Sequence, residues 1–371
     1  MKIHVDRDAF AEAVAWAART LPLRPSVPVL RGLLLEVTDE GLVISTFDYE
    51  VSSRVVIPVT AAEGGRLLVP GRLLADIVRS LPAQPVDLAT DGTRVNINCG
   101  SARFTLPTLA AEDYPTLPEM PEIAGTVESD VFASAVTQAA VAAGRDDTWP
   151  VLTGVRLEVE GDLVTLAATD RYRLAVRELH WQPSRPDASA TVLVPARTLT
   201  DVAKTLTSTA EVRIALAVGS AGEGMIGFEA GGRRTTTRLL DGEFPKYRSL
   251  IPVESGSVAL VDTAAFADAV RRVALVATGH IPLRLSFSTG QVVLEAGVGE
   301  DAQAAETLDA TYDGEELTIA FNPTFLLDGV GSLDSDVTRM AFTGPTKPAV
   351  LTGKDAASEY RYLLMPVRLT G

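Results

Sequence analysis

The pattern of hydrophobic and polar positions predicts short helices and strands that follow one another in a fixed order. Near the amino terminus, Phe10, Val14 and Leu21 recur at the spacing of a helix that buries one face. Aliphatic runs broken by short polar turns follow, which is typical of antiparallel strands. We expect these strands at 29–37, 42–47, 51–59, 66–69, 86–89, 95–99 and 102–106. A second helix is expected after Pro70, because proline suits the start of a helix.

The same pattern returns further along the chain. The segment 8–58 recurs from residue 130 at an offset of 122, so that Gly32 returns as Gly154 and Asp48 as Asp170. A weaker third copy opens at 266–270. One unit laid down three times predicts three domains. We place them at 1–120, 121–253 and 254–371.

Each copy divides into two halves, and each half reads as a helix followed by strands. The second-half helix of copy one starts after Pro70, and counting from Pro195 and from Pro323 gives matching segments in copies two and three. The fold class is therefore α+β, with three repeated domains that each contain two helix-plus-antiparallel-sheet halves. The edges of such sheets must be paired or blunted. A chain of repeats can pair the free sheet edges at its two ends with those of a second chain, and the two chains then close a ring.

Composition and charge narrow the class of protein. Hydrophobic residues make up 46% and charged residues 22%, as in an ordinary globular protein with sizeable cores. No apolar run approaches the roughly 18 residues of a membrane span, and the start of the chain lacks a signal peptide's apolar core. Together with a single cysteine, these features predict a cytoplasmic protein. The net charge of −15 argues against gripping nucleic acid by charge alone, so any DNA contact would be local or enforced by geometry.

The sequence contains no convincing catalytic constellation. Three histidines lie far apart and no Cys/His cluster exists, so neither a metal site nor a cofactor is expected. Cys99 lies in an alternating strand, which favours a structural thiol over a nucleophile. The glycine-rich segment 219–224 reads as a hairpin loop, because no helix follows it. Asp48 and Asp170 recur at strand ends, which favours a turn role over paired catalytic carboxylates.

Several sequence segments resemble those of a known protein family. They are Thr169-Asp170-Arg171-Tyr172-Arg173-Leu174-Ala175, Phe244-Pro245-Lys246-Tyr247-Arg248 with Pro252, the C-terminal Tyr362-Leu363-Leu364-Met365-Pro366-Val367-Arg368-Leu369, and Leu30. With the threefold repeat, they resemble the β subunit of bacterial DNA polymerase III, the sliding clamp family. The segments 47–51 and 144–148 and the last two residues resemble its high-GC Gram-positive branch.

The resemblance implies a function without catalysis. It implies a head-to-tail homodimer closed into a ring around duplex DNA, held by topology and independent of sequence. Such a ring is a processivity factor that tethers the replicative polymerase. The clamp loader, repair polymerases and ligase would bind through a short linear peptide motif, and peptide inhibitors could enter the same pocket. The ring would act in the cytoplasm, at the nucleoid.

The resemblance also implies three sets of functional residues. The DNA channel would use Arg24, Arg72, Arg145 and Arg197, although each can also be a solvated surface arginine. The dimer interface would use Phe104 and Leu106 of one protomer and Leu275 and Val276 of the other. The partner-peptide pocket would use Leu152, Thr169, Arg171, Tyr172, Arg173, Leu174, Pro245, Ser249, Leu250, Pro348, Leu363, Leu364, Met365, Pro366, Val367, Arg368 and Leu369.

The pocket departs from the common family pattern at three positions. Family members more often carry Gly-His where this chain has Arg171-Tyr172, and Arg where it has Ser249. Two alternatives therefore stay open. The chain could be a variant second copy of the clamp with altered partner or inhibitor binding. It could also be an enzyme on a repeated α+β scaffold, although the sequence contains no recognisable set of catalytic residues.

Overall fold

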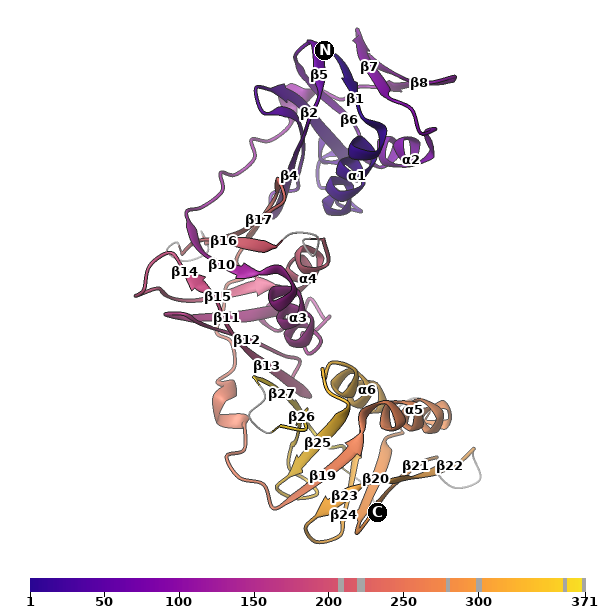
Figure 1. Cartoon of the computed structure of the whole chain (residues 1–371), viewed down its shortest axis with the longest axis vertical. Coiled ribbons are helices and arrows are strands. Elements are labelled where there is room, and N and C mark those ends of the chain that lie inside the picture. Colours follow the sequence, from indigo (N-terminus) through magenta and orange to yellow (C-terminus); the bar gives the residue numbers. More distant parts are fainter. Residues whose placement is uncertain (206–209, 219–223, 278–280, 298–301, 356–358, 369–371) are drawn as a thin grey trace. The chain divides into compact units, whose positions relative to one another are not determined.

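A computed structural model of the chain describes residues 1–205, 210–218, 224–277, 281–297, 302–355 and 359–368 (Figure 1). By spatial proximity the chain forms two compact units. The first unit holds Met1–Ser129, Gln182–Arg185 and Asp201–Leu239, and the second holds Asp130–Trp181, Pro186–Thr200 and the chain from Leu240 onward. The middle repeat is shared, because some of its strands belong to a sheet of the first unit and the others to a sheet of the second.

The first unit contains two antiparallel sheets, a five-stranded sheet ordered β5-β1-β7-β8-β9 and a nine-stranded sheet ordered β14-β10-β16-β17-β18-β4-β3-β2-β6. The strands are β1 (Lys2–Val5), β2 (Gly32–Thr38), β3 (Gly41–Phe47), β4 (Val51–Ile57), β5 (Thr60–Glu63), β6 (Arg66–Pro70), β7 (Val86–Asp91), β8 (Arg94–Cys99), β9 (Ala102–Pro107), β10 (Ile123–Glu128), β14 (Gln182–Pro183), β16 (Glu211–Ala217), β17 (Met225–Ala230) and β18 (Arg233–Arg238).

The second unit also contains two antiparallel sheets, a nine-stranded sheet ordered β15-β11-β12-β13-β27-β26-β25-β19-β23 and a four-stranded sheet ordered β22-β21-β20-β24. The strands are β11 (Gly154–Glu160), β12 (Leu163–Thr169), β13 (Arg173–His180), β15 (Ser189–Pro195), β19 (Ser257–Asp262), β20 (Leu283–Ser288), β21 (Gln291–Ala296), β22 (Ala304–Asp309), β23 (Thr311–Asp313), β24 (Leu317–Phe321), β25 (Val337–Phe342), β26 (Ala349–Gly353) and β27 (Tyr360–Leu364).

The described residues contain six α-helices, two for each repeat, as the sequence predicted (Figure 1). They are α1 (Arg7–Ala17), α2 (Gly71–Ser80), α3 (Ser129–Ala140), α4 (Ala196–Thr205), α5 (Thr263–Val273) and α6 (Pro323–Gly331). Short 3-10 turns are η1 (Ala18–Thr20), η2 (Pro28–Arg31), η3 (Ala111–Asp113), η4 (Pro150–Thr153), η5 (Tyr247–Leu250) and η6 (Ala274–Val276). Side-chain caps define several helix starts: Asp6 accepts hydrogen bonds from the first turn of α1, and Asn322 does so for α6.

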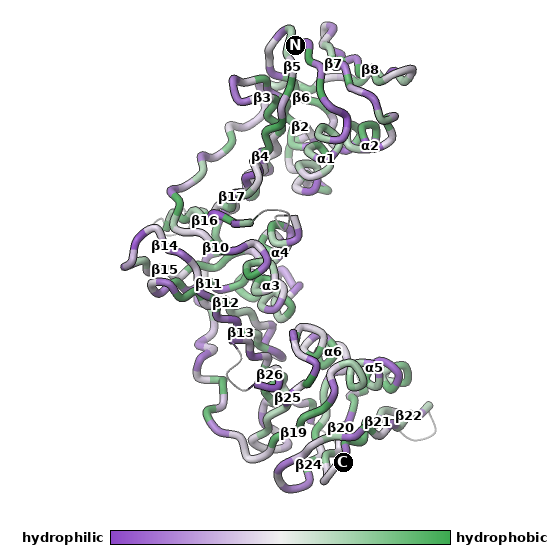
Figure 2. Tube along the Cα trace, viewed as in Figure 1, coloured by the Kyte–Doolittle hydropathy of each residue, from purple (hydrophilic) through white to green (hydrophobic). Residues whose placement is uncertain are grey.

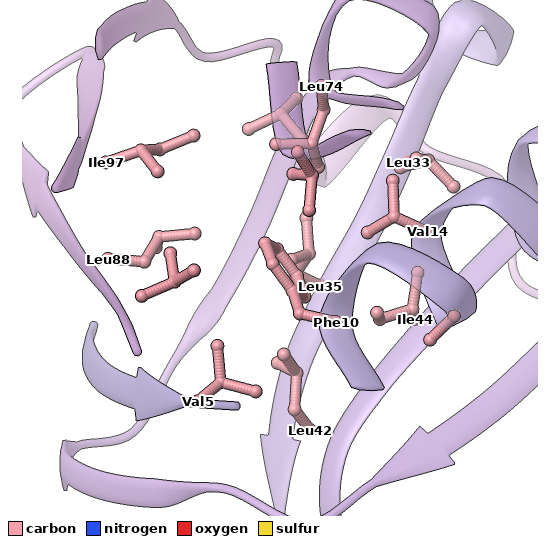
Figure 3. Packing of buried hydrophobic residues seen from close by; sticks show 14 of the residues in the cluster. Val5, Phe10, Val14, Leu33, Leu35, Leu42, Ile44, Leu74, Leu88 and Ile97 are labelled. Carbon is pink, nitrogen blue, oxygen red and sulfur yellow. The ribbon is translucent and has the colours of Figure 1, made fainter. Parts of the chain in front are cut away.

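The core of the first repeat lies between its helices and both sheets of the unit. Figure 3 shows Phe10 and Val14 of α1 directed toward Leu33 and Leu35 of β2. The same cluster reaches residues of the five-stranded sheet such as Leu88. The hydropathy-coloured tube shows a hydrophobic stretch along β2 (Figure 2). The helical spacing in the sequence therefore identified the buried face of α1 correctly.

The segment after β9 covers the other face of β2. Leu34 packs there with Phe47, Leu68 and Tyr114, so consecutive residues of β2 are buried on both faces. The backbone N–H of Phe47 donates to the Tyr114 hydroxyl oxygen at 2.7 Å. Burial raises the pKa of Tyr114 to about 12. Strand alternation alone could not predict this second layer, because it comes from a link about 70 residues away.

The strands of the first repeat differ from the sequence predictions at two places. The strand expected at 29–37 begins at Gly32, because η2 occupies the preceding residues and opens on a proline. Gly32 and its repeat partner Gly154 are required by close packing, since a Cβ would lie 2.5 Å from Leu68 Cδ1 and 2.7 Å from Leu193 Cγ, respectively. The short strand β5 was not predicted. Most of the glycine-rich segment 219–224 lies outside the described residues.

Candidate partner, dimer and DNA surfaces

A strained turn joins β12 to β13. The backbone N–H groups of Tyr172 and Arg173 donate to Asp170 Oδ1 at 3.0 and 3.1 Å. Arg171 has a φ of 80°, a left-handed conformation that costs a residue with a Cβ about 1–2 kcal/mol. The first repeat has the same turn, in which Asp48 accepts from Val51 and Tyr49 has a φ of 76°. The predicted turn role of both aspartates is confirmed.

Arg173 anchors the base of this turn in a buried network. Its Nε donates to Asp170 Oδ2 at 2.9 Å, and its Nη1 donates to Asp328 Oδ2 of α6 at 2.6 Å. Its guanidinium lies 4.4 Å from the ring centroid of Phe325. Burial alone would lower the pKa of Arg173, but Tyr362 and the two carboxylates raise it. Arg173 therefore stays charged and ties the second repeat to the third.

Replacing Arg173 by methionine is expected to lower the free energy of unfolding of the second unit by about 3 kcal/mol, because two carboxylates lose their buried partner. Urea denaturation followed by tryptophan fluorescence measures this loss. The control is Arg271→Met, which removes an exposed pair with Asp268 and should cost less than about 1 kcal/mol. Equal losses in the two variants would refute the structural role of the network.

A cleft of about 500 Å³ opens beside the turn, and we call it the Trp149 cleft. Cations and aromatic rings alternate along it: the Arg171 guanidinium lies 5.2 Å from the Trp149 ring centroid and 6.0 Å from that of Tyr172. Tyr172 in turn stacks on Phe325 at 6.1 Å. The lining residues are Ala143, Gly144, Arg145, Asp146, Trp149, Leu152, Asp170, Arg171, Tyr172, Arg173, Thr324, Phe325 and Asp328. Apolar walls with a few fixed charges suit a peptide with hydrophobic anchors.

Four predicted pocket residues line this cleft, namely Leu152, Arg171, Tyr172 and Arg173. Two others support it. The buried Thr169 hydroxyl donates to the Arg173 carbonyl at 2.6 Å and so stabilises the turn. The half-exposed Met365 donates its N–H to the Tyr172 carbonyl at 2.9 Å, which brings the C-terminal segment to the cleft.

The other predicted pocket residues lie elsewhere on the sheet. Leu174 and Leu363 pair across β13 and β27 and pack in a buried cluster with Phe244 and Tyr247. Leu364 pairs with Arg173 instead, so strand alternation places it on the opposite face from Leu174. The family resemblance places Leu152, Leu174, Leu250 and Leu364 in one pocket. The structure separates Leu174 from Leu364, and only the tertiary register decides this.

The remaining predicted pocket residues follow the links and the C-terminal strand. Pro245, Ser249 and Leu250 are exposed on the link that crosses the Leu174 face. Pro348 and Pro366 are half-buried, and Val367 and Arg368 are exposed. The N–H of Val367 donates to the Ala320 carbonyl at 2.8 Å. Leu369 lies outside the described residues.

The predicted dimer residues lie on the edge strand β9 and on the 3-10 turn η6. β9, with Phe104 and Leu106, ends the five-stranded sheet, and β22 ends the four-stranded sheet. Phe104 is half-buried and Leu106 is fully buried in its own protomer. Leu275 of η6 is 80% exposed, and its neighbour Val276 is half-buried. Leu106 therefore supports the edge from within, and Phe104, Leu275 and Val276 are the side chains available for contact.

Family models of the DNA polymerase III beta subunit match the chain three times. The N-terminal domain model matches residues 1–118, the central domain model 126–246 and the C-terminal domain model 248–368. The chain belongs to the DNA polymerase III beta subunit family. The resemblance seen in the sequence is thereby confirmed, and with it the fold of three clamp domains.

Individual relatives agree with this assignment. The chain is 60% identical over 100% of both chains to the beta sliding clamp of Streptomyces coelicolor, which confirms the actinobacterial type. It is 44% identical, over 99% of both, to the beta sliding clamp homolog GriR of Streptomyces muensis. The crystal structure of a sliding clamp from Pseudomonas aeruginosa bound to griselimycin matches 100% of both chains with a TM-score of 0.92 and 29% identity.

The four arginines that clamp family membership suggests for the channel are all exposed. Arg72 and Arg197 occupy the first turns of α2 and α4, which are equivalent helices. Arg72 also donates to the Leu21 carbonyl at 3.3 Å, three residues before Arg24. Arg145 follows α3 and lines the Trp149 cleft.

Trp149, Phe325 and Asp328 were missed by the sequence analysis of this clamp. Trp149 is 54% exposed in the structure, and its position beside Pro150 was the one signal that the sequence offered. Phe325 and Asp328 gave none, because they read as ordinary positions of α6. Cys99 is buried and its thiol donates to the carbonyls of Pro82 and Gln84.

Within the described residues, no three His, Cys, Asp or Glu side chains cluster as metal ligands. Within the same part of the chain, no helix is long and apolar enough to cross a membrane.

Proposed function

We propose that this chain is a replicative sliding clamp, a non-catalytic processivity factor that closes around duplex DNA as a head-to-tail homodimer. The observation that carries the proposal is the strand count of the four sheets. Two sheets have nine strands, and the other two have five and four, which together equal nine. A second copy can complete each incomplete sheet, because β9 of one protomer can add to β22 of the other.

The order of strands supports this pairing. β9 occupies the place in its sheet that β18 and β27 occupy in theirs, and β22 matches β4 and β13. Inside the chain, β18 pairs antiparallel with β4, and β27 pairs antiparallel with β13. The same join between protomers would make β9 antiparallel to β22. Both ends of the protomer would be used, as a closed head-to-tail ring requires, and we propose that the ring contains two copies.

Repeat symmetry also gives a register. Phe104 corresponds to Thr235, because each is the third residue of a strand that follows a two-residue turn. Ala304 corresponds to Ser53, because each pairs with the sixth residue of the preceding strand. Since Thr235 pairs with Ser53, Phe104 should lie opposite the partner subunit's Ala304.

The charge distribution fits a ring that slides. A net charge of −15 disfavours a tight electrostatic grip, while exposed arginines at the helix starts can attract phosphates without reading sequence. We assign Arg24, Arg72, Arg145 and Arg197 to the channel. The third repeat has Pro323-Thr324-Phe325 at the helix start where the first two repeats have Arg72 and Arg197. The positive charge lining the channel would therefore be unevenly distributed among the three repeats.

We assign the Trp149 cleft and the adjoining C-terminal segment to partner peptides of the replicative polymerase, the clamp loader, repair polymerases and ligase. The solved relative that binds griselimycin supports the expectation that a peptide inhibitor also binds. The higher identity to the Streptomyces coelicolor clamp, 60% against 44% for GriR, favours the replicative clamp over a variant copy. We also propose domain boundaries near residues 120 and 253 and action on the chromosome in the cytoplasm.

Cross-linking on DNA tests the ring directly. A protein with Phe104→Cys and Ala304→Cys is loaded onto nicked circular duplex by a bacterial clamp loader and then oxidised. Directly opposed strand residues have Cβ atoms close enough for a disulfide. We expect the covalent ring to stay on circles in denaturing detergent and to leave once the DNA is cut.

Two controls make the result decisive. Each single-cysteine protein should be stripped from circles by detergent. Pairing Phe104→Cys with Ala302→Cys shifts the register by two residues and should cross-link poorly, since diagonal neighbours are about 7–8 Å apart. Retention on linear DNA, or equal retention of all proteins, contradicts the ring.

A further inference from the structure

A second cleft, of about 550 Å³, lies on the other face of the nine-stranded sheet of the second unit, and we call it the Arg339 cleft. Its floor includes Val176, which shares its strand face with Leu174, whereas Arg173 and the Trp149 cleft belong to the opposite face. The lining residues are Val176, Glu178, Tyr247, Arg248, Ile251, Pro252, Val253, Glu254, Ser255, Arg339, Ala341, Thr343, Val350, Thr352 and Arg361.

The arginines of this sheet divide into two groups. Arg156 and Arg177 pair with Glu158 and Glu359 at 2.5 and 2.6 Å, and Arg173 pairs with two aspartates. The guanidinium groups of Arg339 and Arg361 form no ion pair or hydrogen bond with any other described residue, although both backbones pair within the sheet. Both are half-buried and both line the cleft. The only unpaired guanidinium groups among the described arginines of this sheet therefore face one cavity.

Strand register places these two arginines on the two strands that flank β26, opposite the same residue of β26. Arg339 of β25 pairs with Thr352 of β26. Leu351 pairs with Tyr362, so the next residue, Thr352, lies opposite Arg361 of β27. The two arginines are thus two strand spacings apart, about 9–10 Å between backbones, and point to the same face. Two long guanidinium side chains at this spacing can close on one oxyanion.

The surroundings of the pair restrict what can bind. Glu178 and Glu254 also line the cleft, but neither lies within ion-pair distance of Arg339 or Arg361. The third cation, Arg248, is held by Glu158 at 2.5 Å. Ile251, Pro252 and the 98% exposed Val253 form an apolar wall beside the two free cations.

We propose that the Arg339 cleft binds an oxyanion, a phosphate or carboxylate, held between Arg339 and Arg361. A bound oxyanion would accept bidentate hydrogen bonds from the two guanidinium groups. Its negative charge would neutralise the two positive charges that lie on either side of Thr352. The apolar wall would take an uncharged part of the same ligand. No residue lines both the Arg339 cleft and the Trp149 cleft, so the oxyanion site stands whether or not the proposed clamp function holds.

Calorimetric titration of the full-length protein at low salt tests the site. The probes are inorganic pyrophosphate and an acetylated, amidated tri-glutamate peptide, which separate a phosphorylated ligand from a peptide carboxylate. In the Arg339→Gln, Arg361→Gln variant we expect binding of at least one probe to weaken about tenfold or more, because charge-assisted hydrogen bonds are lost. Glutamine keeps most of each stem, and circular dichroism verifies the fold.

The matched control is Arg213→Gln with Arg284→Gln, which removes the same charge from two exposed ion pairs on other sheets. It should bind both probes like the unmodified protein. A loss for pyrophosphate alone identifies a phosphate site, and a loss for the peptide alone identifies a carboxylate site. Failure of both probes to bind, or equal weakening in the two double variants, overturns the proposal.

Discussion

Replacing Leu275 and Val276 together by aspartate is expected to convert a dimer of about 80 kDa, twice the 39.3 kDa chain, into a folded monomer. In the proposed ring these side chains are covered by the partner subunit. Each apolar side chain that stays in water forfeits about 1.5–3 kcal/mol of association free energy. The introduced carboxylates would also have to be buried without partners. Light scattering measures the mass, and circular dichroism checks the fold.

The control for this variant is Leu23→Asp. Leu23 is 73% exposed, close to the 80% of Leu275, but it is not one of the residues proposed for the dimer interface. The control protein should remain a dimer. If the Leu275→Asp, Val276→Asp protein also remains a dimer, the interface is elsewhere and the strand-count argument loses its support.

Deleting residues 365–371 is expected to abolish measurable binding of a Gln-x-x-Leu-Phe-like peptide while leaving the dimer intact. The intact protein should bind such a peptide with micromolar affinity, about −8 kcal/mol. The deletion removes Met365, whose N–H bonds the Tyr172 carbonyl, and Val367, whose N–H bonds the Ala320 carbonyl. The C-terminal wall of the cleft is then lost, and Tyr172 loses a support. Calorimetry measures the affinity, and polymerase stimulation should fall with it.

Two point variants show which face of the sheet holds the peptide anchors. Trp149→Ala removes the exposed end of the cation–aromatic stack, and Leu250→Ala removes an exposed leucine on the Leu174 face. We expect Trp149→Ala to weaken binding by about 1–3 kcal/mol, as for an interface anchor. Peptide binding that survives the deletion unchanged would show that the pocket is elsewhere.

Local chemistry made much of this fold predictable from sequence. The spacing of Phe10 and Val14 identified a buried helix face, and Pro70 marked the start of α2. The recurrence of Asp48 as Asp170 predicted a repeated turn, and both turns form. Each feature depends on residues a few positions apart, where spacing and side-chain type determine the conformation. The threefold repeat then multiplied each local signal.

Contacts between distant segments required the tertiary structure. Ser52 and Thr236 share a hydrogen bond across β4 and β18 although 184 positions separate them, and no local pattern specifies that join. The same holds for the contact of Trp149 with Arg171 and for the salt bridge from Arg173 to Asp328. The sequence by itself determined the repeats, the helices, most strands and the family of this protein. Only the tertiary structure decided which strands join into nine-stranded sheets and which residues share a cleft, because those pairings depend on register and packing between segments far apart in the chain.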